Sequence, residues 1–370
     1  MRLPSSSLTA LILALAVAPL SLPVRAQDEP AAEPVAAEAP AAEADETAAE
    51  PEAEPEAEAE AAAETPAARP VTPRPAELAV KATSNPLLKV VSTGKRFVAV
   101  GAHGHILTSP DGKAWKQVAS PVDALLTSVA FADPQHGWAV GHDATILATT
   151  DGGDTWTLQN FQPDLGKPLF DVLFFDPQNG IAVGAYGLML ATSDGGGSWA
   201  QVASNPVTEN ERHFNALTRL GDGSLMVVGE AGTIGLSPDR GQTWSSIAGP
   251  YESSLFCVIP AGEKGALIGG LRGNSFYTTD VAAGSWSKIE TGTDQSLFGM
   301  AAIPGDRVAM VGLNATLLIF DAAGKTKAVP ITDPAGNKQT DTLSWVMPTR
   351  DGTLLVVGDA GVQRLDAAKF

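Results

Sequence analysis

A short glycine-punctuated phrase recurs seven times along the chain, and this repeat limits the fold more than any other feature. Each copy has an apolar or β-branched run, a glycine, two variable residues, a small residue and a second apolar run. The glycines stand 40 to 46 residues apart, at Gly101, Gly141, Gly184, Gly229, Gly270, Gly312 and Gly358. Repeats of this length that contain several short strands are typical of propeller blades. The sequence therefore predicts an all-β fold, a seven-bladed β-propeller.

The unit from residue 126 to 158 shows how one blade is built. Apolar and β-branched runs at 127–131, 138–140, 145–149 and 156–158 predict four antiparallel strands. An Asp-Pro pair opens the first turn, because these two residues favour turn geometry. The repeat glycine opens the second turn, where we expect it to supply a positive φ. Each blade is thus predicted to be a four-stranded antiparallel sheet.

A second signature, an aspartate followed by glycine and then tryptophan, occupies the turn before the fourth strand. Four clear copies and a weaker fifth are present, with the pairs Asp111 and Trp115, Asp151 and Trp156, Asp194 and Trp199, Asp239 and Trp244, and Asp280 and Trp286. They resemble the Asp-box, also called the bacterial neuraminidase repeat. The carboxylate is expected to accept hydrogen bonds from N–H groups of its own turn, and the tryptophan to pack between blades. These ten residues are therefore predicted to be structural, and none of them catalytic.

The two ends of the repeat region predict how the ring closes. After the strand near residues 362–365 no Asp-box or tryptophan follows, so the last blade is predicted to lack its own fourth strand. Residues 76–81 alternate between apolar and polar side chains like a strand. We expect this N-terminal strand to complete the last blade, because that pairing would remove an exposed sheet edge. The propeller domain then runs over residues 76–370.

The first 75 residues have a different composition. A basic residue, an apolar run and a small-residue cleavage site over residues 1–26 indicate a secretory signal peptide and an exported protein. Residues 27–75 contain fourteen acidic and two basic residues, with mainly alanine and proline between them. Such a segment cannot bury enough apolar surface to fold, so a disordered acidic tether is predicted. It acts either as a solvated spacer or as an arm that docks on a basic partner.

Charge and cysteine content exclude several classes of function. The propeller region has 28 acidic and 20 basic residues, and because the basic residues are scattered along the sequence, no nucleic-acid partner is expected. The single cysteine, Cys257, lies in an apolar run and is expected to be buried rather than reactive. No phosphate-binding, zinc or nucleophile motif is recognisable. The sequence therefore predicts no cofactor, no metal and no catalytic residue, and we expect a monomer.

The export signal, the seven repeats and the Asp-boxes together resemble the photosynthesis system II assembly and stability factor family of propellers. The likeness covers about 76–370 and is clearest at 138–141 and 146–156. It implies a non-enzymatic assembly module, since photosynthetic members assist assembly of the photosystem II reaction centre on the lumenal side of the thylakoid. Those members carry an arginine-rich patch that this sequence does not visibly reproduce. The implied partner is a membrane complex, photosystem II-like or a transporter, in the thylakoid lumen or the periplasm depending on the host.

The turns between the second and third strands of a propeller gather on one face around the central channel. Here they would form one ring of side chains, His103, His142, Asp143, Tyr186, Glu230, Arg272, Asn314 and Asp359. Different side chains at equivalent positions suit a specific binding face, and an ordinary solvated rim is the alternative interpretation. A metal held by His103, His142 and Asp359 would draw on neighbouring blades, but no local spacing supports it.

The competing function is a sialidase-like glycoside hydrolase, since sialidases also contain Asp-boxes. That chemistry requires three arginines to clamp a carboxylate and a tyrosine nucleophile with an acidic partner. Sialidases have six blades and an early Arg-Ile-Pro motif, whereas this chain has seven repeats and no such motif. Tyr186 and Arg272 are the only tyrosine and arginine expected on the rim. The sequence therefore favours a binding module over an enzyme.

Overall fold

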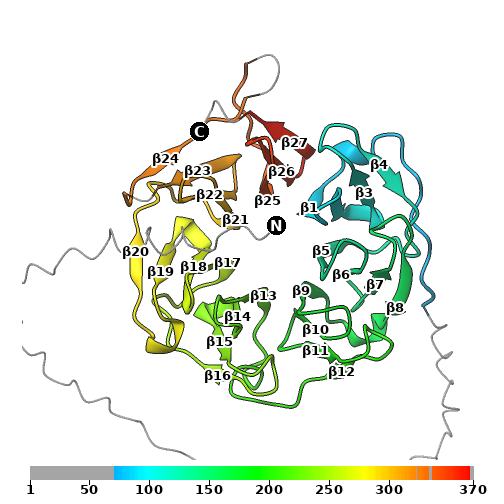
Figure 1. Cartoon of the computed structure of the whole chain (residues 1–370), viewed down its shortest axis with the longest axis horizontal. Coiled ribbons are helices and arrows are strands. Elements are labelled where there is room, and N and C mark those ends of the chain that lie inside the picture. Colours follow the sequence, from blue (N-terminus) through cyan, green and yellow to red (C-terminus); the bar gives the residue numbers. More distant parts are fainter. Residues whose placement is uncertain (1–70, 322, 333–335, 367–370) are drawn as a thin grey trace, which may run out of the picture. The chain divides into compact units, whose positions relative to one another are not determined.

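Seven small antiparallel sheets stand around a common axis in the computed structural model, which describes residues 71–321, 323–332 and 336–366 (Figure 1). Six of the sheets have four strands and the seventh has three. In every sheet the strands follow in chain order from the axis outward. The prediction of an all-β, seven-bladed propeller is confirmed. The predicted signal peptide and nearly all of the predicted tether lie outside the described residues.

Every blade is a simple up-and-down meander. The strands of blades one to four are β1 (Leu87–Ser92), β2 (Phe97–Gly101), β3 (Ile106–Ser109), β4 (Lys116–Val118), β5 (Leu126–Phe131), β6 (Gly137–Gly141), β7 (Ile146–Thr149), β8 (Thr157–Asn160), β9 (Leu169–Phe174), β10 (Gly180–Gly184), β11 (Met189–Thr192), β12 (Ala200–Gln201), β13 (Phe214–Arg219), β14 (Leu225–Gly229), β15 (Ile234–Ser237) and β16 (Ser245–Ser246). Those of blades five to seven are β17 (Leu255–Ala261), β18 (Gly265–Gly270), β19 (Ser275–Thr278), β20 (Ser287–Ile289), β21 (Leu297–Ile303), β22 (Arg307–Gly312), β23 (Thr316–Phe320), β24 (Thr326–Ala328), β25 (Leu343–Pro348), β26 (Leu354–Gly358) and β27 (Gly361–Leu365).

Helical structure in the described residues is limited to single 3₁₀ turns. These are η1 (Ala82–Ser84), η2 (Ala102–Gly104), η3 (Pro163–Leu165), η4 (Glu230–Gly232), η5 (Leu271–Gly273) and η6 (Val281–Ala283). None of the described helices has the length and apolar content needed to cross a membrane.

The apolar core is divided into seven clusters, one at each interface between neighbouring blades. Alternate side chains of one strand serve two interfaces: Val98 and Val100 of β2 pack toward blade two, whereas Ala99 packs toward blade seven. Both faces of each sheet are therefore covered. This accounts for the continuous apolar runs of the second and third strands, which are buried almost throughout.

The repeat glycines have a different role from the one expected of them. Gly101, Gly229 and Gly270 have φ of −179°, −166° and −161°, which is extended backbone open to any residue. Each of the seven glycines ends the second strand of its blade, where a Cβ atom would lie 1.9–2.3 Å from the carbonyl oxygen that precedes the innermost strand. The prediction of positive φ at these glycines is wrong. Close approach of two backbones, rather than turn geometry, excludes a side chain there.

The expected N-terminal strand of the last blade is absent. Residues 76–81 form no strand, and in the described residues blade seven keeps only β25, β26 and β27. Leu78 and Val80, the apolar residues of the alternating pattern, are both exposed. The prediction is wrong because the segment finds its hydrogen bonds elsewhere: Ala76 N–H donates to the Ser120 carbonyl at 3.1 Å, beside β4 of blade one.

Side-chain packing closes the ring instead. Leu87 and Leu107 of blade one share a buried cluster with Leu355 of blade seven, and the innermost strands β1 and β25 lie in contact. Arg350 and Arg364 of blade seven add hydrogen bonds to the carbonyl oxygens of Gly94 (2.7 Å) and Asp111 (3.1 Å) in blade one. First and last blades therefore meet as any other neighbouring pair does.

Candidate binding surfaces

The meander gives the ring two unlike faces. Because neighbouring strands are antiparallel, the turns between second and third strands lie on one face, which we call the rim face. The turns between first and second strands share the opposite face with the Asp-box turns, and we call this the Asp-box face. Each face thus collects seven equivalent sets of loops.

All eight predicted rim residues lie in the turns of the rim face. They occupy two adjacent turn positions rather than one. His142, Glu230 and Asp359 directly follow the repeat glycine, whereas His103, Asp143, Tyr186, Arg272 and Asn314 stand one residue later with φ of 52–57°. Seven of the eight are exposed, and Asp143 is half-buried.

Two of the rim carboxylates are engaged by their own chain. Glu230 Oε2 accepts a hydrogen bond from His213 N–H at 3.2 Å, and Asp359 Oδ2 accepts one from Thr342 N–H at 3.1 Å. In each case the donor lies in the loop that leads into the innermost strand of the same blade. These side chains brace turns, which favours the solvated-rim interpretation for this pair.

Tyr186 is the most accessible aromatic residue of the rim. Its side chain is exposed, and its ring lies edge-to-face against His213 with centroids 4.7 Å apart. Within the described residues no carboxylate contacts its hydroxyl and no arginine packs on its ring. No group of three or more His, Cys, Asp or Glu side chains in the described chain could hold a metal ion. The rim thus presents an aromatic platform without the partners that a tyrosine nucleophile needs.

Every innermost strand contains a β-bulge that sequence reasoning missed. In each blade the register shifts by one residue next to the repeat glycine. The bulged residues are half-buried and mostly apolar, namely Leu88, Thr127, Phe170, Asn215, Phe256, Phe298 and Ser344. Bulges re-aim side chains at sheet edges. Here they bring Phe256 and Phe298 of neighbouring blades into ring contact at 5.2 Å.

A buried ion pair ties several innermost strands together. Lys89 Nζ in β1 lies 2.6 Å from Asp171 Oδ1 in β9 and 3.0 Å from Ser128 Oγ in β5. The other Asp171 oxygen accepts the Leu217 N–H of β13 at 2.9 Å. The Lys89 ammonium also lies 4.6 Å from the ring centre of Trp345 in β25. This network connects blades one, two, three, four and seven near the axis.

The Asp-boxes have the geometry of self-capped turns. Asp151 Oδ1 accepts the N–H groups of Asp154 (3.0 Å) and Thr155 (2.9 Å), while the Thr155 hydroxyl donates to Oδ2 at 2.6 Å. Partial burial alone would raise the pKa of Asp151, but these hydrogen bonds outweigh it and lower that pKa to about 2. The same arrangement recurs at Asp194 and Asp239. Asp111 keeps only the bonds from backbone N–H groups.

The fifth Asp-box departs from the others. Asp280 caps the single turn η6 by accepting the Ala282 N–H at 3.0 Å. The tryptophans differ as well: the indole N–H of Trp115, Trp156 and Trp244 donates to a glycine carbonyl in its own turn, whereas that of Trp286 is buried without a hydrogen-bond partner in the described residues. The weaker sequence match at residues 280–286 thus corresponds to a different turn.

Acid should weaken these turns selectively. A carboxyl whose folded pKa lies below its unfolded value stabilises the fold above about pH 4 and loses that contribution as pH falls toward the folded pKa. With Asp151 and Asp194 both lowered to about 2, the melting temperature is expected to fall between pH 4 and pH 2. Asp151→Asn should reduce this slope. Melting curves from pH 5 to pH 2 provide the measurement, and an unchanged slope in Asp151→Asn would contradict the assignment.

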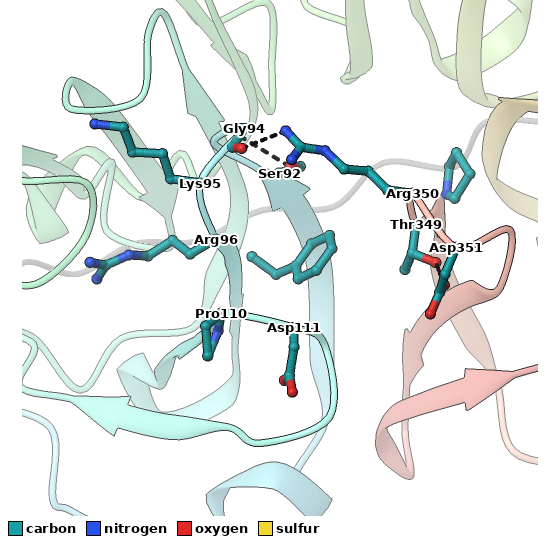
Figure 2. Close-up of a pocket in the computed structure, with 11 residues that line it drawn as sticks. Ser92, Gly94, Lys95, Arg96, Pro110, Asp111, Thr349, Arg350 and Asp351 are labelled. Carbon is teal, nitrogen blue, oxygen red and sulfur yellow. Dashed lines mark hydrogen bonds between the residues drawn. The ribbon is translucent and has the colours of Figure 1, made fainter.

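A cluster of cations lies on the Asp-box face where blade one meets blade seven. Lys95, Arg96 and Lys116 of blade one and Arg350 of blade seven line two hollows there. Together with Lys113, in the turn between β3 and β4 of blade one, we call them the basic surface. A cleft of about 220 Å³ opens between the two blades, and Arg350 reaches across it to the Gly94 turn while Lys95 and Arg96 point to the other side of that turn (Figure 2). A second hollow beside it is lined by Lys95, Arg96 and Lys116.

Most of this positive charge has no counter-ion. Arg96 is paired with Asp154, and its pKa is raised by that hydrogen bond. The side chains of Lys95, Lys113 and Lys116 make no hydrogen bond or close ion pair within the described residues, and Arg350 bonds to a carbonyl oxygen. The surface is not free of carboxylates: Asp111 and Asp351 also line the cleft. The pKa of Asp111 is lowered by the N–H groups of its own turn and by the nearby charge of Lys113. The chain as a whole has a net charge of −18. The exposed Lys95 and Lys116, which have no ion-pair partner among the described residues, suit an acidic ligand.

Sequence reasoning missed the basic surface, although a signal was present. Residues 87–118 carry five lysines and arginines against one acidic residue, while residues 126–160 carry no lysine or arginine at all. Counting charge blade by blade would have shown the asymmetry. The expectation of scattered cations therefore needs correction, because the fold gathers several cations on one blade and its neighbour.

Comparison with known proteins decides the family. The model of the photosynthesis system II assembly factor YCF48 family matches residues 107–362, which is more than half of the chain. This chain belongs to the YCF48 family. The resemblance inferred from the repeats and Asp-boxes is confirmed.

Individual relatives of the YCF48 family match more partially. The photosystem II assembly protein Ycf48 of Thermosynechococcus vestitus is 31% identical over 217 residues, which cover 58% of this chain and 61% of that protein. The photosystem II assembly lipoprotein Ycf48 of Synechocystis is 51% identical over 43 residues, 11% of this chain and 13% of that protein. This chain thus spans about three fifths of the length of the Thermosynechococcus vestitus protein.

The solved structure of YCF48 bound to D1 peptide shares the fold. It superimposes with a TM-score of 0.61 at 18% identity and covers 80% of this chain and 97% of that one. At this level of identity the match supports a common propeller architecture. Family membership itself follows from the sequence match.

Proposed function

We propose that this chain is an exported, non-enzymatic assembly factor that binds an acidic segment of a membrane-protein client through its basic surface. Membership of the YCF48 family supports the assembly role, and a structural relative bound to a peptide supports recognition of a polypeptide segment. The observation that carries the choice of site is the presence beside the Lys95–Arg96 turn of two exposed lysines, Lys95 and Lys116, that have no ion-pair partner among the described residues. The client is a subunit of a photosystem II-like complex or of a transporter.

The basic surface suits such a segment better than the rim does. Lys95 and Lys116 are exposed and have no ion-pair partner in the described part of the chain, so little has to be broken at these two residues before a ligand binds. The cleft and the neighbouring hollow share Lys95, Arg96 and Pro110 in their linings, so an extended chain could contact both. Glu230 and Asp359 of the rim face, in contrast, already bond to backbone N–H groups. Tyr186 is proposed as a secondary contact.

Charge reversal tests this assignment. The tagged protein is cross-linked in native membranes, and the partner is identified by mass spectrometry. The double variant Lys95→Glu and Lys116→Glu should recover at least tenfold less of the client subunit than the wild type, because each reversal replaces attraction by repulsion. Loss of wild-type recovery in high salt should accompany this effect. Both lysines are exposed, so folding should be unaffected.

Matched variants separate the alternatives. Lys264→Glu with Lys288→Glu changes the same charge on blade five and should leave client recovery unchanged. If Tyr186→Ala abolished recovery while the blade-one reversals did not, the client would bind at the rim instead. Hydrolysis of a fluorogenic sialoside that disappears in Tyr186→Phe would overturn the non-enzymatic assignment in favour of the glycoside hydrolase.

A further inference from the structure

Blade seven is the one blade whose third strand has no outer neighbour among the described residues. In the other six blades a fourth strand of two to four residues lies outermost. In blade seven that outermost place belongs to β27, which has five residues and pairs with β26 without a bulge (Figure 1). A regular strand with one unpaired side is ready to pair with another chain. The outer side of β27 is therefore a candidate docking edge.

The register of β27 shows which backbone groups face outward. A turn of two residues joins β26 to β27, and Gly358 is paired with Gly361 across it. Such a closing pair exchanges hydrogen bonds, and hydrogen-bonded pairs then alternate along an antiparallel ladder. Gln363 therefore bonds to β26, whereas the N–H and C=O groups of Val362 and Arg364 point to the outer side. We call these four groups the free edge.

One end of the free edge meets the basic surface. The Arg364 side chain points toward blade one, where it donates to the Asp111 carbonyl at 3.1 Å and pairs with Asp351. Asp111 and Asp351 both line the cleft of the basic surface. The Arg364 charge is thus already neutralised, and β27 contains no lysine or proline, the residues that commonly protect an edge. A chain seated in the cleft lies next to a strand that can pair with it.

The other end of the free edge lies near exposed apolar side chains. On the rim face η1 contacts β27, with Thr83 against Gly361, the first residue of the strand. Leu78 and Val80 stand a few residues before Thr83. Their side chains are 70% and 104% exposed, the two highest values among large apolar residues of the described chain. An apolar side chain of a ligand would gain free energy by covering them.

We propose that β27 takes up an extended segment of the client as the fourth strand of blade seven. This inference rests on the function proposed above and says how the client is held. The segment runs antiparallel to β27, as the fourth strands of the other blades run to their third strands. Its N-terminal end then lies at the Asp-box face and carries the carboxylates, while its C-terminal end brings an apolar residue to Leu78 and Val80. Backbone pairing supplies affinity, and the side chains supply selectivity.

A second copy of this chain fits the edge less well than a client segment does. A stable protein–protein interface buries about 1,200 Å² or more in total, whereas β27 offers a ladder of five residues. A client segment adds the contacts of the basic surface at one end and of the exposed apolar side chains at the other. The occupant is therefore a chain that follows all three features in order.

N-methylated peptides test strand addition to the full-length protein. The probe is a labelled peptide of four glutamates followed by Thr-Val-Thr-Val-Thr. Successive N–H groups of a strand face opposite sides, so methylation blocks pairing only where the methyl group faces β27. Methylation of one alternate set of N–H groups should weaken binding at least tenfold, and methylation of the other set should change it less than twofold. Fluorescence anisotropy measures the affinities.

The direction of the segment is tested with the same probe in reverse order. A peptide whose four glutamates follow the Thr-Val-Thr-Val-Thr stretch should bind at least fivefold more weakly than the original probe, because antiparallel pairing would carry its carboxylates to the rim face. Tighter binding of this peptide would contradict the antiparallel arrangement.

Hydrogen exchange examines the free edge itself. Without peptide, the N–H groups of Val362 and Arg364 in the monomeric protein should exchange rapidly, and saturating probe should slow them at least tenfold. The N–H of Gln363, which already bonds to β26, should change little. Slow exchange at Val362 and Arg364 before peptide is added would show that another part of the chain or a second copy covers the edge, and the proposal would be overturned.

Val362→Pro removes one outward N–H group and leaves the bonds to β26 in place. The unmethylated probe and both methylated peptides should bind this variant equally weakly, at least tenfold below the unmethylated probe on the wild type. A melting curve checks that the variant is folded. If it is not, the methylated peptides and the exchange rates of the wild-type protein decide the question.

The outcomes separate this inference from the proposed function. If neither methylated set changed the affinity while Lys95→Glu with Lys116→Glu still weakened the probe, binding of an acidic ligand would stand and strand addition would fall. If the methylation pattern held but this charge reversal altered neither probe affinity nor client recovery, strand addition would stand and the basic surface would fall as the client site.

Discussion

Asp171→Asn is expected to lower the free energy of unfolding by about 3–5 kcal/mol, because it breaks a buried ion pair and leaves the Lys89 ammonium uncompensated. The Asp171 carboxylate and the Lys89 ammonium are both largely buried. The carboxylate also accepts hydrogen bonds from the Ser128 hydroxyl and from the N–H groups of Val172 and Leu217. An amide presents one acceptor and two donors in place of two acceptors, so at least one of these donors loses its partner. Urea denaturation of the two proteins measures the difference.

Two comparisons isolate the role of burial. Asp154→Asn removes the exposed partner of Arg96 and should cost less than about 1 kcal/mol, as exposed ion pairs usually do. Lys89→Met combined with Asp171→Leu removes both buried charges and should recover part of the loss. Recovery stays incomplete because the Leu217 N–H still lacks an acceptor. A loss below 1 kcal/mol for Asp171→Asn would show that the network contributes little.

The blade pattern was predictable because its determinants are local. A strand, its turn and the next strand lie within about 16 residues, and turn chemistry acts over a still shorter distance. The Asp-box carboxylates bond to N–H groups two to four residues away, so their geometry follows from a short motif. The number of blades then follows from counting repeats. Local information was sufficient for the architecture.

Features that depend on distant pairs escaped prediction. Lys89 and Asp171 are 82 residues apart in sequence, and Arg350 meets Gly94 across 256 residues. The sequence around these residues does not show which distant group each cation will contact. That pairing is set only when the ring is closed. The same limitation explains the error at residues 76–81, whose alternation is compatible with a strand although Gln117 and Ser120 of blade one provide their hydrogen-bond partners.

The candidate binding surfaces include one feature that local sequence could place and one that depends on distant residues. The rim ring was placed correctly on one face because it is tied to the repeat glycines. The sequence did not show that Glu230 and Asp359 would accept hydrogen bonds from the backbone of their own blades. The basic surface was missed because its residues come from separate segments. In blade one these are the turn between β1 and β2, the Asp-box turn and strand β4, and in blade seven the turn between β25 and β26. Only the folded ring assembles them.

Trp156→Ala should lower the free energy of unfolding by about 3–5 kcal/mol, because it leaves a large cavity between blades one and two. The Trp156 ring is buried, packs edge-to-face against Phe131 with centroids 6.2 Å apart, and shares a cluster with Val98 and Leu126. Its indole N–H donates to the Gly153 carbonyl at 3.3 Å. This cluster joins blade two to blade one. The loss should therefore appear as a lower urea midpoint for unfolding of the whole domain.

Trp199→Ala, at the interface between blades two and three, provides the matched control for Trp156→Ala. Trp199 stands at the equivalent position of the next Asp-box, yet its side chain is only partly buried and its indole N–H reaches Gln159 Oε1 at the long distance of 3.5 Å. Its loss should cost about 1–2 kcal/mol. Equal losses in the two variants would mean that the tryptophans act through their turns rather than through burial between blades. A larger loss for Trp156→Ala would show that packing between blades, which every blade needs on both faces, is what these tryptophans supply.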